Sequence, residues 1–153
     1  MNIAVLITCH NRKTKTLRCL KHLFNSELKK SYNLDVFLVD DGSSDGTSIS
    51  VNKDYPQVNI IEADGSLFWG GGMRLAWEAA VKYKEFDYFL WLNDDANIYT
   101  NSINEMLEIC ANNNNEAIVV GSTIDPFQKR ISYGGVLKDK SLVIPNGNIQ
   151  ECN

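Results

Sequence analysis

The fold is decided by the stretch VFLVDDGSSDGT, which occupies residues 36–47. Its first four residues form a continuous apolar run, which is typical of a strand that other elements cover on both faces. The remaining eight residues are rich in Asp, Gly and Ser, and this composition is a turn signal. Thr47 can cap a short helix that runs towards Asp54. The stretch therefore predicts a buried strand that ends abruptly in a polar loop.

The same order, an apolar strand followed by a polar cluster, occurs twice more in the chain. Residues 3–8 precede the cluster Thr8-Cys9-His10-Asn11, and residues 88–92 precede Asn93-Asp94-Asp95. Because the carboxyl ends of parallel strands meet at one edge of a sheet, and ligands bind there, we expect the three clusters to lie on one rim.

Helices and weaker strands are predicted between these strands. Apolar residues recur at helical spacing in residues 14–24, 73–84 and 102–112, a weaker strand is expected at 58–61, and a fifth strand is expected at 118–121. This alternation predicts an α/β fold, with a mostly parallel sheet and helices on both faces. Beyond Pro126 the pattern changes to short β pieces, near residues 130–133 and 142–144.

Length and composition fit one soluble domain over residues 1–153. Apolar residues make up 44% of the chain and charged residues 22%. The net charge is −4 and the sequence contains no basic stripe, so nucleic acid is not expected as a partner. The four cysteines lack metal-binding spacing, and the short apolar start has no basic region before it that would make a signal peptide. We expect a cytoplasmic protein, with membrane association at the cytoplasmic face as an open alternative.

The acidic pair Asp94-Asp95 is the first candidate for chemistry at the rim. Adjacent carboxylates at a strand end are costly unless a cation joins them, and Mg²⁺ or Mn²⁺ binds one or two carboxylates together with substrate phosphates. A plain Asx turn is the equally weighted alternative. Asp41 could instead accept hydrogen bonds from a base or a ribose, although Asp-Gly-Ser-Ser-Asp-Gly is also ordinary turn chemistry.

Two further segments could reach the same ligand. The side chains of residues 8–12 offer a hydroxyl, an imidazole, an amide and a guanidinium, and a base-contacting or structural role for His10 is favoured over catalysis. The glycines at 70–72 open a helix whose N-terminus favours anions, with Arg74 facing phosphate or, alternatively, lying on the surface. This is not the phosphate loop of a Walker-type NTPase. Phe68 and Trp69 are expected to pack in the core or as a lid, and Trp77 and Trp91 in the core.

Together these residues resemble glycosyltransferase family 2, the inverting enzymes with the GT-A fold. The matching stretches are residues 7–12, 39–47, 65–74 and 93–95, and residues 68–72 and 132–135 resemble a rhamnosyltransferase-like bacterial subgroup. The resemblance implies a Rossmann-like GT-A fold and transfer of a sugar from a UDP- or dTDP-linked donor to a glycan or lipid-linked acceptor in cell-surface polysaccharide synthesis. It also implies Mg²⁺ or Mn²⁺ as cofactor. The expected nucleotide-binding residues are Thr8, His10, Asn11, Arg12, Asp41, Gly42, Gly71, Arg74 and Asp94, with Asp95 as the metal ligand.

The sequence departs from this family where the catalytic base is expected. The family has an acidic residue in a Glu-Asp-like signature downstream of the metal motif, and none of the acids after Asp95 sits in such a signature. We therefore expect a chain cut short before its acceptor-binding half, and self-association into a homodimer through exposed apolar surface. The alternatives are a non-catalytic nucleotide-sugar-binding module and, with little support, a phospho-acceptor receiver domain.

Overall fold

The order of the elements along the chain follows the predicted alternation. A computed structural model describes residues 1–115, 117–125 and 131–133. The chain forms two compact units, Met1–Asn101 and Ser102–Asn153, and each is described by itself. The sequence predicts one nucleotide-binding domain over the whole chain, and this stays a prediction.

The first unit is built on a four-stranded parallel sheet. Its strands are β1 (Asn2–Cys9), β2 (Asn33–Asp41), β3 (Asn59–Ala63) and β4 (Tyr88–Trp91), in the spatial order β3-β2-β1-β4. Every residue of β1 from Ile3 to Cys9 is buried, as is every residue of β2 from Val36 to Asp41. The two central strands are therefore covered on both faces, which is why their apolar runs are continuous.

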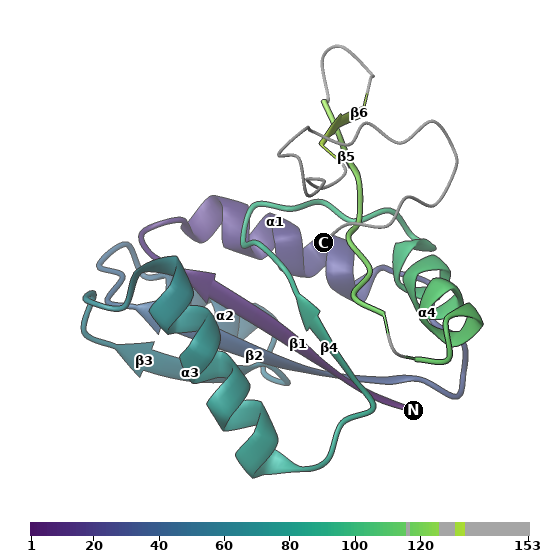
Figure 1. Cartoon of the computed structure of the whole chain (residues 1–153). Coiled ribbons are helices and arrows are strands. Elements are labelled where there is room, and N and C mark those ends of the chain that lie inside the picture. The colour runs from purple at the N-terminus through teal and green to yellow at the C-terminus, as the bar shows by residue number, and fades with distance from the viewer. Residues whose placement is uncertain (116, 126–130, 134–153) are drawn as a thin grey trace, which may run out of the picture. The chain divides into compact units, whose positions relative to one another are not determined.

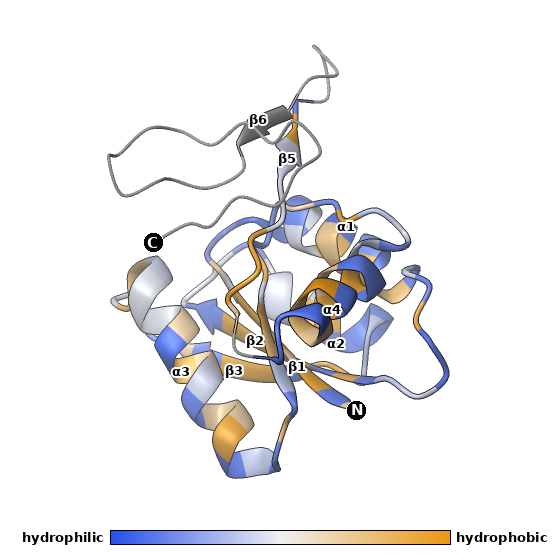
Figure 2. Ribbon diagram, turned by 45° about the vertical axis from the view of Figure 1, so that its right-hand side comes forward, coloured by the Kyte–Doolittle hydropathy of each residue, from blue (hydrophilic) through white to orange (hydrophobic). Residues whose placement is uncertain are grey.

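Helices cover both faces of this sheet (Figure 1). They are α1 (Lys13–Phe24), α2 (Thr47–Asp54) and α3 (Phe68–Tyr83). Both views place α3 on one side of the strands and α1 and α2 on the other, and Figure 2 shows the hydrophobic strands between them. Because side chains of a strand alternate between faces, half of each central strand packs on α3. That core cluster consists of Ala4, Leu6, Phe37, Val39, Met73, Ala76 and Ala80.

Helix α3 lies close to β1 because Gly72 has no side chain. A Cβ atom at Gly72 would lie 2.1 Å from Thr8 Oγ1 and 2.8 Å from Thr8 Cβ. By contrast, Gly70 is exposed and a Cβ there would meet nothing within 4 Å. The glycines thus lie inside the first turns of α3, which begins at Phe68, five residues before the start predicted from the apolar spacing.

Two tryptophans predicted to be core residues are partly exposed, so that prediction is wrong. Trp77 is 37% exposed and Trp91 is 50% exposed. Trp77 stacks on Phe89 with ring centroids 4.3 Å apart, and Trp91 meets the rings of both Trp77 and Trp69 edge-on. The reason is that β4 is an edge strand of the four-stranded sheet. Aromatic side chains there pack on one another and remain open on their outer side.

The second unit contains α4 (Ser102–Asn112) and a short antiparallel pair, β5 (Thr123–Ile124) with β6 (Ile131–Tyr133). The strand predicted at residues 118–121 is wrong: that segment has no regular structure, and Ile118 is 96% exposed. An apolar run forms a strand only where a neighbouring strand pairs with it, and none does among the residues described. The β piece predicted at 142–144 lies outside those residues. No helix in the described part of the chain is both long and apolar enough to cross a bilayer.

Candidate functional site

His10 follows β1 and is held by hydrogen bonds at both ring nitrogens. Nδ1 lies 2.5 Å from the Asp41 carbonyl oxygen, and Nε2 lies 3.0 Å from Asn11 Nδ2. A carbonyl only accepts and an amide nitrogen only donates, so Nδ1 carries the hydrogen and Nε2 accepts. Both ring nitrogens of His10 are therefore used in hydrogen bonds. The base-contacting or structural role expected for His10 from the sequence stays a prediction.

Asn11 joins the end of β1 to the turn that follows β2. Its backbone has a positive φ of 51°, a conformation that Asn tolerates better than most residues. Its amide oxygen accepts a hydrogen bond from the Ser44 N–H at 2.8 Å, and its own N–H donates to Ser43 Oγ at 2.8 Å. These bonds fix the two loops relative to each other.

The two carboxylates at the end of β2 both bind backbone N–H groups. Asp40 accepts from the N–H of Ser43 and of Ser48, so it closes the turn before α2. Asp41, only 4% exposed, accepts from the N–H of Gly65 at 2.9 Å, Leu67 at 3.0 Å and Phe68 at 2.9 Å. A carboxylate offers about four acceptor positions, so Asp41 is almost fully used in holding the segment between β3 and α3.

Glycines allow the turn after β2 and the segment between β3 and α3 to lie close together. Gly42 has a φ of 71°, and a Cβ atom there would lie 2.7 Å from the backbone nitrogen of Gly65. Gly65 itself has a φ of 93°. Both the left-handed backbone and the lack of space require glycine at residue 42. The turn after β2 thus lies directly against the segment that leads into α3.

At the end of β4, two carboxylates share one guanidinium. Arg12 Nη1 lies 3.1 Å from Asp94 Oδ1 and 3.2 Å from Asp95 Oδ2, and Lys15 Nζ lies 3.7 Å from Asp95 Oδ2. Burial raises the pKa of Asp94, against the opposing effect of Arg12. Asp94 Oδ2 is buried and has no hydrogen-bond partner among the described residues. An additional cation would therefore find one free carboxylate oxygen here.

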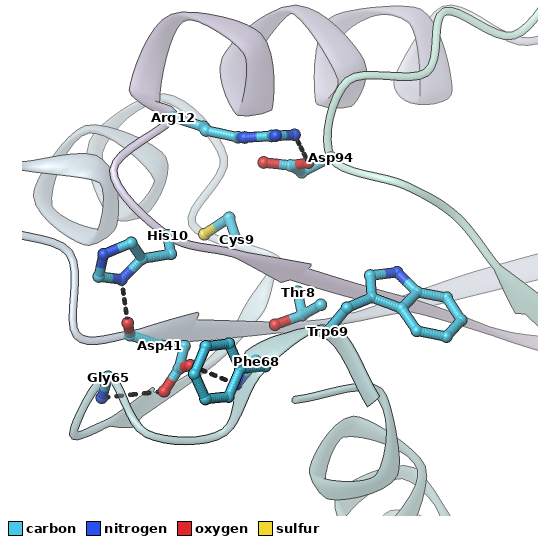
Figure 3. A pocket seen from close by; sticks show the side chains of 9 residues that line it. All are labelled: Thr8, Cys9, His10, Arg12, Asp41, Gly65, Phe68, Trp69 and Asp94. Carbon is cyan, nitrogen blue, oxygen red and sulfur yellow. Dashed lines mark hydrogen bonds and ion pairs between the residues drawn. The ribbon is translucent and has the colours of Figure 1, made fainter. Parts of the chain in front are cut away.

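These loops enclose a pocket of about 370 Å³, a volume within the usual range for small-molecule sites. Asp41, Gly65 and Phe68 lie at one end of it, Arg12 and Asp94 at the other (Figure 3). The lining residues come from the loop ends of β1, β2 and β4 and from the start of α3, and they are Thr8, Cys9, His10, Arg12, Asp41, Gly65, Phe68, Trp69 and Asp94. The three polar clusters thus meet at one rim, as the parallel sheet predicts.

The sequence-predicted site residues fall into three groups. Those that line the pocket are Thr8, His10, Arg12, Asp41 and Asp94. Asp95 contacts Arg12 from beside the pocket, and Asn11 and Gly42 brace its loops. Gly71 and Arg74 are not among its lining residues, and Arg74 instead pairs with Glu78 one helical turn away at 3.1 Å.

Phe68 and Trp69, expected from the sequence in the core or as a lid, both line the pocket. Their side chains are 82% and 53% exposed, so neither is a core residue. Trp69 Nε1 donates to Asn93 Oδ1 at 3.1 Å, which places the indole ring beside the loop that carries Asp94 and Asp95. The adjacent glycines were the available signal, since they mark a place where the backbone lies near a ligand.

Residues 4–147 match the sequence model described as Glycosyl transferase family 2. No curated protein sequence matches the chain. Two similar solved structures are S. aureus TarS 1–349 in complex with UDP-GlcNAc and the mannosyltransferase PcManGT from Pyrobaculum calidifontis in complex with GDP-Man and Mn²⁺.

The TarS structure has a TM-score of 0.62 and 19% identity and covers 82% of this chain and 38% of its own. PcManGT has a TM-score of 0.63 and 16% identity and covers 82% of this chain and 36% of its own. Likeness at this level shows the GT-A fold, and the chain spans little more than a third of the length of either structure. The narrower rhamnosyltransferase-like resemblance stays a prediction.

Proposed function

Because the chain belongs to glycosyl transferase family 2, we propose that its pocket binds a nucleoside-diphosphate sugar and that the protein transfers the sugar with inversion. The single observation that carries this proposal is the convergence of Asp41, Arg12 and Asp94 on one pocket at the carboxyl ends of parallel strands. Strand ends of this kind are where α/β folds bind ligands. The nucleotide sugars bound by the TarS and PcManGT structures support the same ligand class.

The two ends of the pocket differ in charge, which suggests how the donor lies. Arg12, 47% exposed in its side chain, already contacts both carboxylates and can turn a guanidinium edge towards phosphate oxygens. The Asp41 end consists of backbone N–H groups, an aromatic ring and a carboxylate that is already hydrogen-bonded. We therefore infer that the diphosphate lies at the Asp94 end and the nucleoside at the Asp41 end.

The acidic pair suits a divalent metal that the substrate helps to hold. Asp94 and Asp95 supply the hard oxygen ligands that Mg²⁺ and Mn²⁺ prefer, and the unpartnered Asp94 Oδ2 fits a cation ligand. No group of three or more protein ligands gathers among the described residues, so phosphate oxygens and water would complete the coordination. When bound, the metal neutralises charge on the departing diphosphate. Asp94, Asp95 and Arg12 would orient that group.

The pocket also supports a second candidate, a nucleotide-sugar-binding module without transferase activity. Asp41 is occupied by backbone N–H groups, and Asp94 pairs with Arg12 through Oδ1 and offers Oδ2 to the proposed metal. His10 has no free ring nitrogen. The described lining thus assigns no general base, a group that commonly contributes a factor of about 10² to 10⁴ to the rate.

The test is ligand-dependent thermal stability. We expect UDP or dTDP with Mn²⁺ to raise the melting temperature, since a ligand at 100 times its Kd stabilises the folded state by about 2.7 kcal/mol. Asp95→Ala should remove the metal-dependent part, whereas Asp54→Ala, an exposed acid on α2, should not. No shift with any nucleoside diphosphate would refute donor binding. Binding without any sugar transfer or donor hydrolysis would favour the module.

A further inference from the structure

The acidic pair lies on a tight turn that begins at Asn93. The carbonyl oxygen of Asn93 accepts a hydrogen bond from the Ala96 N–H at 3.0 Å, so Asp94 and Asp95 are the central residues of the turn 93–96. The position of Asn93 therefore helps to determine where both carboxylates lie.

Two helices on opposite faces of the sheet hold Asn93. From α1, the thiol of Cys19 donates to the Asn93 carbonyl oxygen at 3.4 Å, and from α3 the indole N–H of Trp69 donates to Asn93 Oδ1 at 3.1 Å. Figure 1 shows these two helices on either side of the strands. The turn is thus attached to both helical layers through its first residue.

The ring of Trp69 is itself held in place. It meets the ring of Trp91 with centroids 5.8 Å apart, and Trp91 in turn meets Trp77, which stacks on Phe89. Trp69 also lines the pocket (Figure 3). Although its side chain is 53% exposed, both the ring and the N–H have partners, so Trp69 can act as a firm support for Asn93.

The ion pairs of the acidic turn hold it less firmly. Asp95 contacts Arg12 at 3.2 Å and Lys15 at 3.7 Å, and the side chains of these two cations are 47% and 51% exposed. Ion pairs at such exposed positions contribute little to stability. In the proposed function, Arg12 also turns towards the phosphates of the donor. The hydrogen bond from Trp69 to Asn93 requires no such exchange and can persist while the donor binds.

We propose that Trp69 is a positioning residue for the metal site, which acts by holding Asn93 and with it the turn that carries Asp94 and Asp95. The proposal rests on the proposed function and deepens it. The indole N–H of Trp69 only donates, so Trp69 is not itself a ligand of the cation. Holding a site in its bound shape before the ligand arrives reduces the entropy that binding costs. Residues that orient the ligands of a metal in this way affect metal affinity.

The experiment is a calorimetric titration of UDP into the protein, with Mn²⁺ in one series and EDTA in the other. The ratio of the two affinities measures how far the metal strengthens UDP binding. Trp69→Phe keeps an aromatic ring but removes the donor N–H, and it should lower this ratio by about 2- to 13-fold, as expected for the loss of one hydrogen bond. The affinity of this variant for UDP in EDTA and its melting temperature should remain close to those of the wild type.

Two further variants separate positioning from a general effect of losing a tryptophan. Trp77→Phe makes the same chemical change in the same helix, at a ring that stacks on Phe89, and it should leave the ratio unchanged. Asn93→Leu removes the acceptor and should lower the ratio as Trp69→Phe does. The double variant should lose little more than either single variant, because both changes remove the same hydrogen bond.

Each outcome supports or overturns the proposal. A wild-type protein that binds no UDP refutes the proposed function, and one that binds UDP without help from Mn²⁺ refutes its metal site; the role of Trp69 fails in both cases. If Mn²⁺ strengthens binding equally in the wild type and in Trp69→Phe, the role of Trp69 alone is refuted. Equal losses of UDP affinity with Mn²⁺ and with EDTA would mean that Trp69 is only a wall of the pocket. Additive losses in the double variant would mean that Trp69 and Asn93 act independently, which also overturns the proposal.

Discussion

Substituting Gly72 by alanine should destabilise the protein, whereas the same substitution at Gly70 should not. At Gly72 the new Cβ atom would lie 2.1 Å from Thr8 Oγ1 and 2.8 Å from Thr8 Cβ. Thr8 is 8% exposed on the central strand, so its Cβ cannot move away without moving β1. Overpacking of this kind costs about 3 kcal/mol at its upper range. The better helix propensity of alanine returns about 1 kcal/mol, which leaves a net loss of about 2 kcal/mol.

Gly70→Ala is the matched control, because it makes the same chemical change in the same helix. A Cβ atom at Gly70 meets nothing within 4 Å, so only the gain in helix propensity remains, at most about 1 kcal/mol. The free energies of unfolding should therefore differ by about 3 kcal/mol between the two variants. Urea denaturation followed by far-ultraviolet circular dichroism measures this difference.

A double variant tests the assigned cause. Thr8→Ala removes the oxygen at 2.1 Å but leaves the Cβ at 2.8 Å, so it should relieve part of the strain in Gly72→Ala. The combined loss should then be smaller than the sum of the two single losses, as expected for residues in contact. If Gly72→Ala is as stable as Gly70→Ala, helix α3 does not lie on β1 as closely as described, and the reasoning is refuted.

Two other predictions concern charge and thiols. Arg12→Ala should raise the pKa of Asp94 further above its ordinary value, because Arg12 is what lowers it against burial. A carboxyl group whose pKa is raised in the folded state loses its contribution to stability as pH rises through that pKa. The variant should therefore be about 1 kcal/mol less stable than wild type at pH 7.5. This difference should vanish at a pH below the ordinary pKa range of Asp, and urea denaturation at several pH values measures it. Burial raises the pKa of Cys9 and of Cys19 to about 12, so iodoacetamide at pH 8 should modify both only after unfolding, as mass spectrometry can show. Rapid alkylation of either thiol in native buffer would contradict the burial.

The sheet and the rim could be predicted because they depend on local patterns and one geometric rule. Continuous apolar runs mark strands that are covered on both faces, and parallel strands bring their carboxyl ends together. The polar clusters at Thr8, Asp41 and Asp94 therefore had to meet. The fold class and the family membership are confirmed by the structure and by the family match.

Contacts between distant segments could not be predicted in the same way. The hydrogen bonds that Asp41 accepts from the N–H groups of Gly65, Leu67 and Phe68 span 24 to 27 positions, and no spacing rule predicts them. The exposure of Phe68 follows from those bonds. The spacing of Trp77 indicates a helix face but not which element covers it, and the apolar run at residues 118–121 does not reveal whether a strand pairs with it.

The contact between Gly42 and Gly65 limits how the pocket can be re-engineered. Grafting residues 64–68 from another protein would bring in a backbone whose course need not match the resident turn, and a Cβ atom on Gly42 would lie only 2.7 Å from the backbone nitrogen of Gly65. A transplant that reshapes the Asp41 end of the pocket should therefore exchange residues 41–42 and 64–68 together. A side chain at residue 42 would require the backbone of residues 64–65 to move with it.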